Sequence, residues 1–470
     1  MTLIKSISGI RGTIGGKVGE NLTPLDAVKF AAAYGTFLKN AKISDTNSTT
    51  NDKKLKVVIG RDARISGAMI HNLVQNTLLG LGIDVIDLGL STTPTVEIAV
   101  PMENADGGII LTASHNPKQW NALKLLNNKG EFLSGKEGEL ILEIADNEDF
   151  NFADVDSLGV ITVNDSYMDI HIDTVLNLPL VDANLVKTKK YKVVVDAVNS
   201  TGGIIIPRLL ELMGVTVVKL YCEPNGIFPH NPEPLKEHLG DICKLVVAEQ
   251  ADFGIVVDPD VDRLAFISND GEMFGEEYTL VACADYVLSK TPGNTVSNMS
   301  SSRALRDITN KYHGNYNASA VGEVNVVDLM KATNAIIGGE GNGGIIYATS
   351  HYGRDSVVGV ALFLTYLASQ NKTVAEIRAG YPHYFMSKNK IELTPLIDVD
   401  AILVAITDAY KNEQISIIDG VKIDFETSWV HLRKSNTEPI IRIYTEAQTQ
   451  FLADELANKI IAQIKGIVAI

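Results

Sequence analysis

Three carboxylates end an apolar run in ADFGIVVDPDVDRLAF, residues 251–266. Asp258, Asp260 and Asp262 occupy alternate positions, so in an extended segment all three side chains face the same way. A slight curl of the chain would converge them on one cation, and a ligand set made only of oxygens suits Mg²⁺ better than zinc. Because an apolar strand delivers the carboxylates to a sheet edge, the pattern favours a magnesium site over a solvated acidic turn.

A second segment with reactive groups is GGIILTASHNPKQWNALK, residues 107–124, in which an apolar strand leads to Ser114 and His115. A serine hydrolase is not indicated, because neighbours in an extended segment point to opposite faces and the G-x-S-x-G motif is missing. By themselves these residues leave two interpretations open. Ser114 and Asn116 either shape a turn before Pro117, or the serine carries a transferable group.

Two further segments carry groups that bind sugars and phosphates. In IIGGEGNGGIIY, residues 336–347, glycines surround Glu340 and Asn342, and a carboxylate beside an amide can hold vicinal sugar hydroxyls. The segment RKSNTEPIIRIY, residues 433–444, offers donors suited to a phosphate, namely Arg433, Ser435, Asn436, Thr437 and Arg442. A plain turn and surface ion pairing are the alternatives for the two segments. Taken together, the four segments predict phosphoryl transfer on a phosphosugar.

The elements that must position these residues alternate between short apolar strands and helical patterns, which is typical of βαβ units. Strands are predicted at 55–60, 84–90 and 107–113. A helix is predicted over 23–40, with Thr23 as its N-cap. The polar stretch 44–54 that follows has no apolar period and is expected to be a solvated loop.

A unit of strand, small polar turn and helix recurs at 56–67, 191–203 and, more weakly, 293–308, which indicates related α/β domains in tandem. The final ninety or so residues differ, because an alternating strand at 440–447 precedes a closing helix at 451–468. A smaller α+β domain is expected there.

Length and charge limit the classes of partner. A chain of 470 residues suggests about three or four domains. The formal net charge of −16 argues against nucleic acid and anionic membranes as partners, although a small anion could bind in a locally basic site. Cys222, Cys243 and Cys283 form no C-x-x-C pair, and the N-terminal sequence lacks the apolar region of a signal peptide. We therefore expect a cytoplasmic protein.

The sequence resembles the α-D-phosphohexomutase family over nearly its whole length. The resemblance is carried by five motifs in the family's order: SGIRG (8–12), TASHNP (112–117), DPDVDR (258–263), GEGNG (339–343) and RKSNTEP (433–439). It implies an α/β fold with three similar mixed α/β domains in tandem and a smaller C-terminal α+β domain around a central cleft. The implied domains are 1–158 with the serine loop, 159–271 with the metal loop, 272–380 with the sugar loop and 381–470 with the phosphate loop.

The resemblance also implies a role for each candidate residue. Ser114 matches the phosphorylated serine, Arg11 the arginine beside it, and His115 and Lys124 the groups that transfer protons, with their division into acid and base left open. Asp258, Asp260 and Asp262 match the Mg²⁺ ligands, joined by a phosphate oxygen on Ser114. The residues expected to bind substrate are Glu340, Asn342, Arg263, Arg433, Ser435, Asn436, Thr437 and Arg442.

The implied reaction interconverts 6-phospho and 1-phospho hexoses through a phosphoserine enzyme and a bisphosphosugar. Its cofactors are Mg²⁺ and a hexose bisphosphate as activator or intermediate, its partners are hexose phosphates, and the chain is expected to be a monomer or homodimer. Asn342 stands where many members have serine, and Pro259 and Val261 stand where glycines are frequent. The first departure bears on the choice among sugars.

Overall similarity favours phosphoglucosamine mutase, with phosphomannomutase or phosphoglucomutase as the alternative. Two other classes are more distant. A phosphatase of the haloacid dehalogenase type would use Asp258 as its nucleophile but leaves the serine motif and the phosphate loop unexplained. A non-catalytic sugar-phosphate sensor has little use for three aligned carboxylates.

Overall fold

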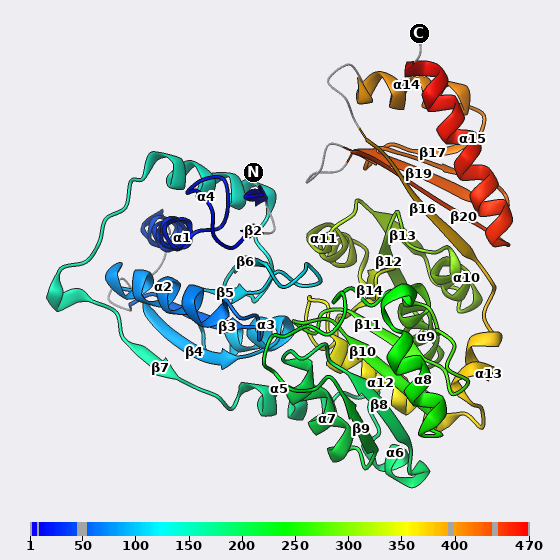
Figure 1. Ribbon diagram of the computed structural model, residues 1–470, viewed down its shortest axis with the longest axis horizontal. Helices are drawn as coiled ribbons and strands as arrows, with labels where there is room; N and C mark the ends of the chain where they lie inside the picture. The colour runs from blue at the N-terminus through cyan, green and yellow to red at the C-terminus, as the bar shows by residue number, and fades with distance from the viewer. Residues whose placement is uncertain (1, 7–8, 45–53, 393–397, 435–439, 469–470) are drawn as a thin grey trace. The chain divides into compact units, whose positions relative to one another are not determined.

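The computed structural model describes residues 2–6, 9–44, 54–392, 398–434 and 440–468 (Figure 1). The chain forms two compact units. The first unit comprises Met1–Thr279 and Gly343–Ala375, and the second comprises Leu280–Asn342 and Glu376–Ile470.

The first unit begins with a seven-stranded sheet in the order β1-β2-β6-β5-β3-β4-β7. Its strands are β1 (Ile4–Ser6), β2 (Gly9–Thr13), β3 (Lys56–Arg61), β4 (Asp84–Leu90), β5 (Gly107–Leu111), β6 (Trp120–Leu126) and β7 (Ile161–Val163). β3 pairs in parallel with β4 and β5, as expected for βαβ units, whereas β6 returns antiparallel to β5. The loop between β5 and β6 therefore carries Ser114 at the carboxyl end of the parallel strands.

Helices cover both faces of this sheet, namely α1 (Pro24–Ser44), α2 (Gly67–Gly80), α3 (Thr93–Met102) and α4 (Gly135–Asn147) (Figure 1). Alternate strand residues face the two layers. Ile59 packs in a core with residues of α1, α2 and α4, whereas Val58 packs in a second core with residues of α3. Burial on both faces explains why the strand sequences are continuously apolar.

The predicted elements of this sheet are largely confirmed. The strand expected at 84–90 is β4, and the helix that begins after Thr23 is α1. Thr23 and Asp26 cap it reciprocally, because the Thr23 backbone N–H donates to the Asp26 carboxylate and the Asp26 N–H donates to Thr23 Oγ1. The helix runs beyond its predicted end, to Ser44, and residues 45–53 of the predicted loop lie outside the described residues.

A second sheet in the first unit has the order β11-β10-β8-β9. It contains β8 (Lys192–Asp196), β9 (Thr216–Leu220), β10 (Phe253–Val257) and β11 (Leu264–Ile267). β8 pairs in parallel with β9 and β10, and β11 pairs antiparallel with β10. The three carboxylates therefore lie in the turn of the β10–β11 hairpin. The other elements are α5 (Tyr167–Leu176), α6 (Ala183–Lys189), α7 (Gly202–Leu212), α8 (Gly240–Ala248), α12 (Ser356–Ser369), β15 (Gly344–Tyr347) and the 3₁₀ turns η1 (Val155–Ser157) and η2 (Lys236–His238).

The second unit contains a parallel and an antiparallel group of strands. In the parallel group β12 (Asn294–Asn298) lies between β13 (Tyr316–Ser319) and β14 (Ala335–Glu340). The helices α10 (Ala304–Lys311) and α11 (Glu323–Thr333) belong to this unit, whereas α9 (Glu276–Lys290) and α13 (Val374–Ala379) cross the boundaries between the two units. The antiparallel sheet has the order β16-β20-β19-β18-β17. Its strands are β16 (Phe385–Glu392), β17 (Gln414–Ser416), β18 (Val421–Asp424), β19 (Trp429–Lys434) and β20 (Ile440–Ala447).

The closing helices α14 (Val399–Ala409) and α15 (Gln450–Val468) share one core with the antiparallel sheet, in which Ile402 and Ile460 pack against Val430 and Ile441 (Figure 1). Three mixed α/β domains and a smaller C-terminal α+β domain confirm the predicted fold class. The four residue boundaries expected from the resemblance stay a prediction. In the described part of the chain, every helix is too short or too polar to span a bilayer.

Four phenylalanines hold α12 against the β10–β11 hairpin. The rings of Phe266 and Phe363 stack with centroids 4.0 Å apart, and Phe253 and Phe274 meet Phe363 edge-on at 5.7 and 5.6 Å. All four residues are fully buried. Because the turn of this hairpin contains the three carboxylates, the packing of the aromatic cluster fixes the position of the metal loop.

We expect Phe363→Ala to lower the free energy of unfolding by about 3–5 kcal/mol, because the lost ring leaves a cavity among three other aromatic rings. Urea denaturation measures the change. Phe451→Ala is the control, since Phe451 is 74% exposed and its loss should change stability by less than about 0.5 kcal/mol. Equal losses in the two variants would contradict this account of the core.

Candidate functional site

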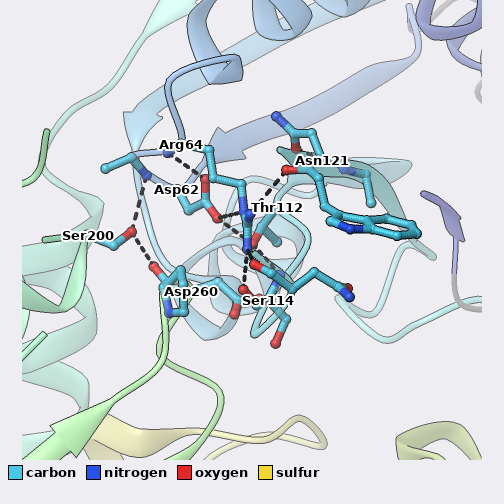
Figure 2. Close-up of polar contacts among 12 residues, drawn as sticks. Asp62, Arg64, Thr112, Ser114, Asn121, Ser200 and Asp260 are labelled. Atoms are coloured by element: carbon cyan, nitrogen blue, oxygen red, sulfur yellow. Dashed lines mark hydrogen bonds and ion pairs between the residues drawn. The ribbon is translucent and has the colours of Figure 1, made fainter. Parts of the chain in front are cut away.

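Ser114 lies in the loop between β5 and β6 with its hydroxyl directed at the metal loop (Figure 2). Its Oγ donates a hydrogen bond of 2.7 Å to Oδ2 of Asp258, and the residue is 7% exposed. Its backbone φ is +48°, in the left-handed region that residues with a Cβ rarely adopt. The strand predicted to reach residue 113 ends at Leu111 because the chain turns here.

The left-handed backbone corrects the expectation for His115. An extended segment would have placed the Ser114 and His115 side chains on opposite faces, but His115 Nδ1 lies 3.4 Å from Ser114 Oγ. Burial, and after it the positive charge of Arg263, lower the pKa of His115 well below its usual range. At neutral pH the imidazole is therefore uncharged and can accept a proton.

The three carboxylates of the metal loop converge as predicted, but by another route. One oxygen of each of Asp258, Asp260 and Asp262 lies within 4.8 Å of the others, and all three residues are fully buried. They are brought together by a tight turn in which Val261 has φ +65°, rather than by the alternation of an extended strand. Val261 is β-branched and buried, so it holds a conformation that glycine adopts more readily.

Most carboxylate oxygens of the loop have partners. Asp258 Oδ1 accepts the backbone N–H groups of Asp262 and Arg263 at 3.1 and 3.0 Å. Asp260 Oδ2 accepts from Lys124 Nζ at 2.7 Å, and the same ammonium donates to Asp262 Oδ2 at 3.2 Å. These contacts fix the orientation of each carboxylate.

Two oxygens remain without a hydrogen-bond partner in the described part of the chain, namely Oδ1 of Asp260 and Oδ1 of Asp262. A buried carboxylate oxygen without a partner is costly in a protein interior, and a hard divalent cation satisfies it. The donor set therefore fits Mg²⁺, with Asp258, Asp260 and Asp262 as the residues that would hold it.

The electrostatics agree with a cation site. Burial, and then the charges of Asp260 and Asp262, raise the pKa of Asp258 well above its usual range. Although burial opposes it, Arg354 and Lys124 hold the pKa of Asp262 below the usual range. Burial by itself would lower the pKa of Lys124, but the charges of Asp260 and Asp262 raise it. Lys124 is therefore an ammonium ion in this site.

Arg11 and Arg263 bring further positive charge to the first unit's site. Arg11 lies on β2, and after burial the charge of Arg263 lowers its pKa while Asp260 opposes the change. Arg263 pairs with Glu233 at 3.2 Å and is 9% exposed. The predicted residues Arg11, Ser114, His115, Lys124, Asp258, Asp260, Asp262 and Arg263 thus gather in one place.

Two residues of this site were not found from the sequence. Thr93 donates from Oγ1 to Asp260 Oδ2 at 2.6 Å, and its backbone N–H binds the Asp260 carbonyl at 2.9 Å. Arg354 donates to Asp262 Oδ2 at 2.7 Å. The Thr-Pro at 93–94 signals only the start of α3, and nothing in the sequence around Arg354 separates it from a surface arginine.

In the second unit, Glu340 ends β14 and is 5% exposed. Its Oε1 accepts from Asn298 Nδ2 at 2.7 Å and from the backbone N–H of Gly322 at 3.2 Å. Asn342 Nδ2 lies 3.5 Å from Glu340 Oε2. The predicted sugar loop therefore presents an oriented carboxylate beside an amide.

Arg433 on β19 and Arg442 on β20 are directly opposite each other in the register of the antiparallel sheet. Like charges at opposed positions repel, so this arrangement favours an anion that both can bind. Arg433 Nε is buried and has no hydrogen-bond partner among the described residues. The other predicted donors, Ser435, Asn436 and Thr437, lie outside the described residues.

Comparison with known proteins matches successive segments of the chain to the domains of one protein family. The four successive domain models of one family match, with the descriptions phosphoglucomutase/phosphomannomutase alpha/beta/alpha domain I (residues 3–152), domain II (169–271), domain III (275–384) and C-terminal domain (390–463). The chain belongs to the phosphoglucomutase/phosphomannomutase family, the α-D-phosphohexomutases. It is therefore a phosphohexomutase, an isomerase, and the phosphatase and sensor alternatives are set aside.

Relatives of this phosphohexomutase span nearly its whole length. A phosphoglucomutase/phosphomannomutase of Thermococcus kodakarensis is 35% identical over 94% of this chain and 96% of its own. A phosphoglucosamine/phosphogalactosamine mutase of Sulfurisphaera tokodaii is 32% identical over 97% and 98% of the two chains. A crystal structure of a family member from Burkholderia thailandensis has the same fold, with a TM-score of 0.84 and 23% identity over 100% of this chain and 98% of that chain.

We expect Mg²⁺ to raise the melting temperature of the phosphohexomutase and Asp260→Asn to abolish most of that rise. At a metal concentration of about 100 times Kd, binding to the folded state contributes about 2.7 kcal/mol. The substituted asparagine side chain would keep the hydrogen bond to Thr93, but the site would lose one anionic ligand. Thermal unfolding and calorimetric titration with Mg²⁺ measure the effect without any substrate.

Asp270→Asn is the matched control for the metal experiment, because Asp270 is exposed and lies outside the cluster. It should keep the full Mg²⁺-dependent stabilisation. An equal stabilisation in Asp260→Asn and the wild type would remove Asp260 from the metal site.

Proposed function

We propose that this phosphohexomutase is a phosphoglucosamine mutase that works through a phosphoserine at Ser114 and a bisphosphosugar intermediate. The observation that carries the proposal is the 2.7 Å hydrogen bond between Ser114 Oγ and Asp258 Oδ2, beside two carboxylate oxygens that no described residue satisfies. A serine used only to shape a turn has no need of that environment. A phosphoryl group on Ser114 would lie next to the cation site.

In the proposed first half-reaction a sugar hydroxyl oxygen forms a bond to the phosphorus on Ser114, and the bond from phosphorus to Ser114 Oγ breaks. The hydroxyl proton passes to a base, and Ser114 Oγ regains a proton as it leaves. We propose Lys124 and His115 as the groups that make these transfers. Mg²⁺ supplies positive charge to the transferring phosphoryl group when it is bound.

The second half-reaction returns the other phosphate of the bisphosphosugar to Ser114, so the net result is movement of phosphate between C6 and C1. We propose that Arg433 and Arg442, with Ser435, Asn436 and Thr437, hold whichever phosphate is not reacting. The opposed arginines support this role because an anion relieves their repulsion. The hexose bisphosphate is the proposed activator, since it phosphorylates Ser114.

Glucosamine phosphate is the proposed sugar because its charged 2-amino group can donate a hydrogen bond to the Glu340 carboxylate. The name of the Sulfurisphaera tokodaii relative includes this substrate. The second candidate is a phosphoglucomutase/phosphomannomutase, which the name of the Thermococcus kodakarensis relative favours. Cys222, Cys243 and Cys283 are not joined in disulfides in the described part of the chain, which supports the proposed cytoplasmic location.

We expect Ser114→Ala to lower kcat by several orders of magnitude, because the group that accepts the phosphoryl is lost. Mass spectrometry of the purified wild-type protein, incubated with hexose bisphosphate, should locate phosphate on Ser114. The control is Ser369→Ala, which removes an exposed hydroxyl on α12 and should leave both measurements unchanged. Full activity in Ser114→Ala, or phosphate on Asp258 in its place, would exclude the mechanism.

We expect glucosamine 6-phosphate to have a kcat/KM at least about tenfold above those of glucose and mannose 6-phosphates, the discrimination that one charged hydrogen bond supplies. Asn342→Ser should reduce this ratio, because Asn342 borders the Glu340 carboxylate. Steady-state kinetics with the three sugars test both statements. A higher kcat/KM for glucose or mannose phosphate would instead favour the second candidate.

Arg433→Ala is the matched control for the sugar assays. In the proposed phosphate clamp Arg433 binds the phosphate, and it does not contact the part of the sugar in which the three substrates differ. It should raise KM for all three sugars by a similar factor, worth about 2 kcal/mol, and should leave their ratio unchanged. It should also release bisphosphosugar during turnover. A changed sugar ratio with unchanged KM would show that Arg433 is not part of a phosphate clamp.

A further inference from the structure

Arg64 lies in the turn after β3, and its guanidinium is buried against the serine loop (Figure 2). Nη1 donates to the carbonyls of Pro117 and Trp120 at 2.8 and 3.1 Å. Nη2 donates to the carbonyl of Asn116 at 2.6 Å and to that of Ser114. One side chain thus binds four backbone carbonyls between Ser114 and the start of β6.

The fifth donor of Arg64 is also used. Nε donates to Asp62 Oδ2 at 3.0 Å, and Asp62 Oδ1 accepts the Arg64 backbone N–H at 2.9 Å. A guanidinium has five N–H donors, and all five of Arg64 have partners in the protein. Arg64 therefore has no donor left for a substrate, and its side chain is 0% exposed.

Asp62 extends this network to the other end of the serine loop. Thr112 donates from Oγ1 to Asp62 Oδ2 at 2.7 Å and accepts the backbone N–H of Ser114 at 2.9 Å. The backbone N–H of Ser114 is thereby held through Thr112 and Asp62, while its carbonyl is held by Arg64. Both peptide groups that flank the Ser114 side chain are fixed.

The same turn is also linked to the metal loop through Ser200. The backbone N–H of Ala63 donates to Ser200 Oγ at 3.3 Å, and that hydroxyl donates to the Pro259 carbonyl at 2.7 Å (Figure 2). Thr201 donates to the same carbonyl at 2.9 Å. Residues 62–64 therefore lie between the loop that carries Ser114 and the loop that carries Asp258.

The conformation of Ser114 explains why such support is needed. A left-handed backbone is unfavourable for serine and persists only where the surroundings determine it fully. If the loop relaxed, the Ser114 hydroxyl would move away from Asp258. Displacement of a reacting group by about 1 Å can lower a rate by about 100-fold.

We propose that Arg64 is a positioning residue that holds the serine loop in its reactive conformation and in register with the metal loop, without touching the substrate. This inference rests on the proposed role of Ser114. Asp62 and Thr112 complete the same network. The loop geometry, and not the charge of Arg64 in the site, is the quantity that the network controls.

The test compares Arg64→Lys with the wild type. Lysine keeps the charge but has three donors in place of five and cannot bind four carbonyls and Asp62 together. We expect kcat to fall about 100-fold with KM within about twofold, and amide hydrogen exchange of residues 113–120 to become faster. The purified full-length enzyme is used, loaded with Mg²⁺ and hexose bisphosphate.

The matched control is Arg303→Lys in the second unit. Arg303 is also buried and donates to backbone carbonyls, at Glu426 and Ser428. The variant should have a lower melting temperature without any change in the exchange of residues 113–120. A fall in stability with unchanged loop exchange and unchanged kcat in Arg64→Lys would overturn the proposal, because that is the result of a purely structural role.

A second pair of variants keeps the test decisive if Arg64→Lys does not fold. Thr112→Val removes the hydroxyl that links Ser114 to Asp62, whereas Thr112→Ser retains it. We expect faster exchange and a lower kcat in the first, and recovery of both in the second. If Ser114→Ala is inactive while both Thr112 variants match the wild type, the positioning role is refuted and the phosphoserine mechanism is retained. An active Ser114→Ala would refute the phosphoserine mechanism itself.

Discussion

Three carboxylates converge in one turn from which water is excluded, and the rest of the first unit's site is organised around their charge. Asp258, Asp260 and Asp262 repel one another, and burial raises the free energy of each charged form. The fold lowers that free energy with Lys124 and Arg354, but one oxygen each on Asp260 and Asp262 finds no partner among the described residues. The residual demand for positive charge is what makes the loop a cation site and not an ordinary buried ion-pair cluster.

The negative charge of these carboxylates also acts on the Ser114 side chain. Ser114 meets the carboxylates through its hydroxyl, so a phosphoryl group there would add negative charge to a place already short of cations. Such a group is tolerated only with Mg²⁺ and the surrounding basic residues. A chain with a net charge of −16 can therefore bind a doubly charged phosphosugar, because its local charge differs from its overall charge. In the second unit the opposed Arg433 and Arg442 likewise give a local positive charge in a chain that is negative overall.

Much of the fold and of the site could be predicted from the sequence because the signals are local. Apolar runs predicted β4 and the strands that lead to Ser114 and Asp258, and Thr23 signalled the start of α1 as its N-cap. The carboxylate triad was evident since its three members lie within five residues. The backbone of Ser114 was not, because nothing in the local sequence signals that a serine will adopt a left-handed conformation, and the expected separation of His115 from Ser114 was wrong for that reason.

The sequence by itself determined which residues are candidates for the chemistry and at which strand ends they lie, because side-chain chemistry and strand periodicity are properties of short segments. Only the tertiary structure decided what surrounds them. Thr93 is 167 residues from Asp260, and Arg64 is 50 residues from Ser114, yet each is in hydrogen-bond contact with its partner. An arginine that binds four carbonyls and one that is exposed to solvent are the same letter in the sequence. They differ in which distant backbone groups the packed core brings within reach, and this is a property of the whole fold.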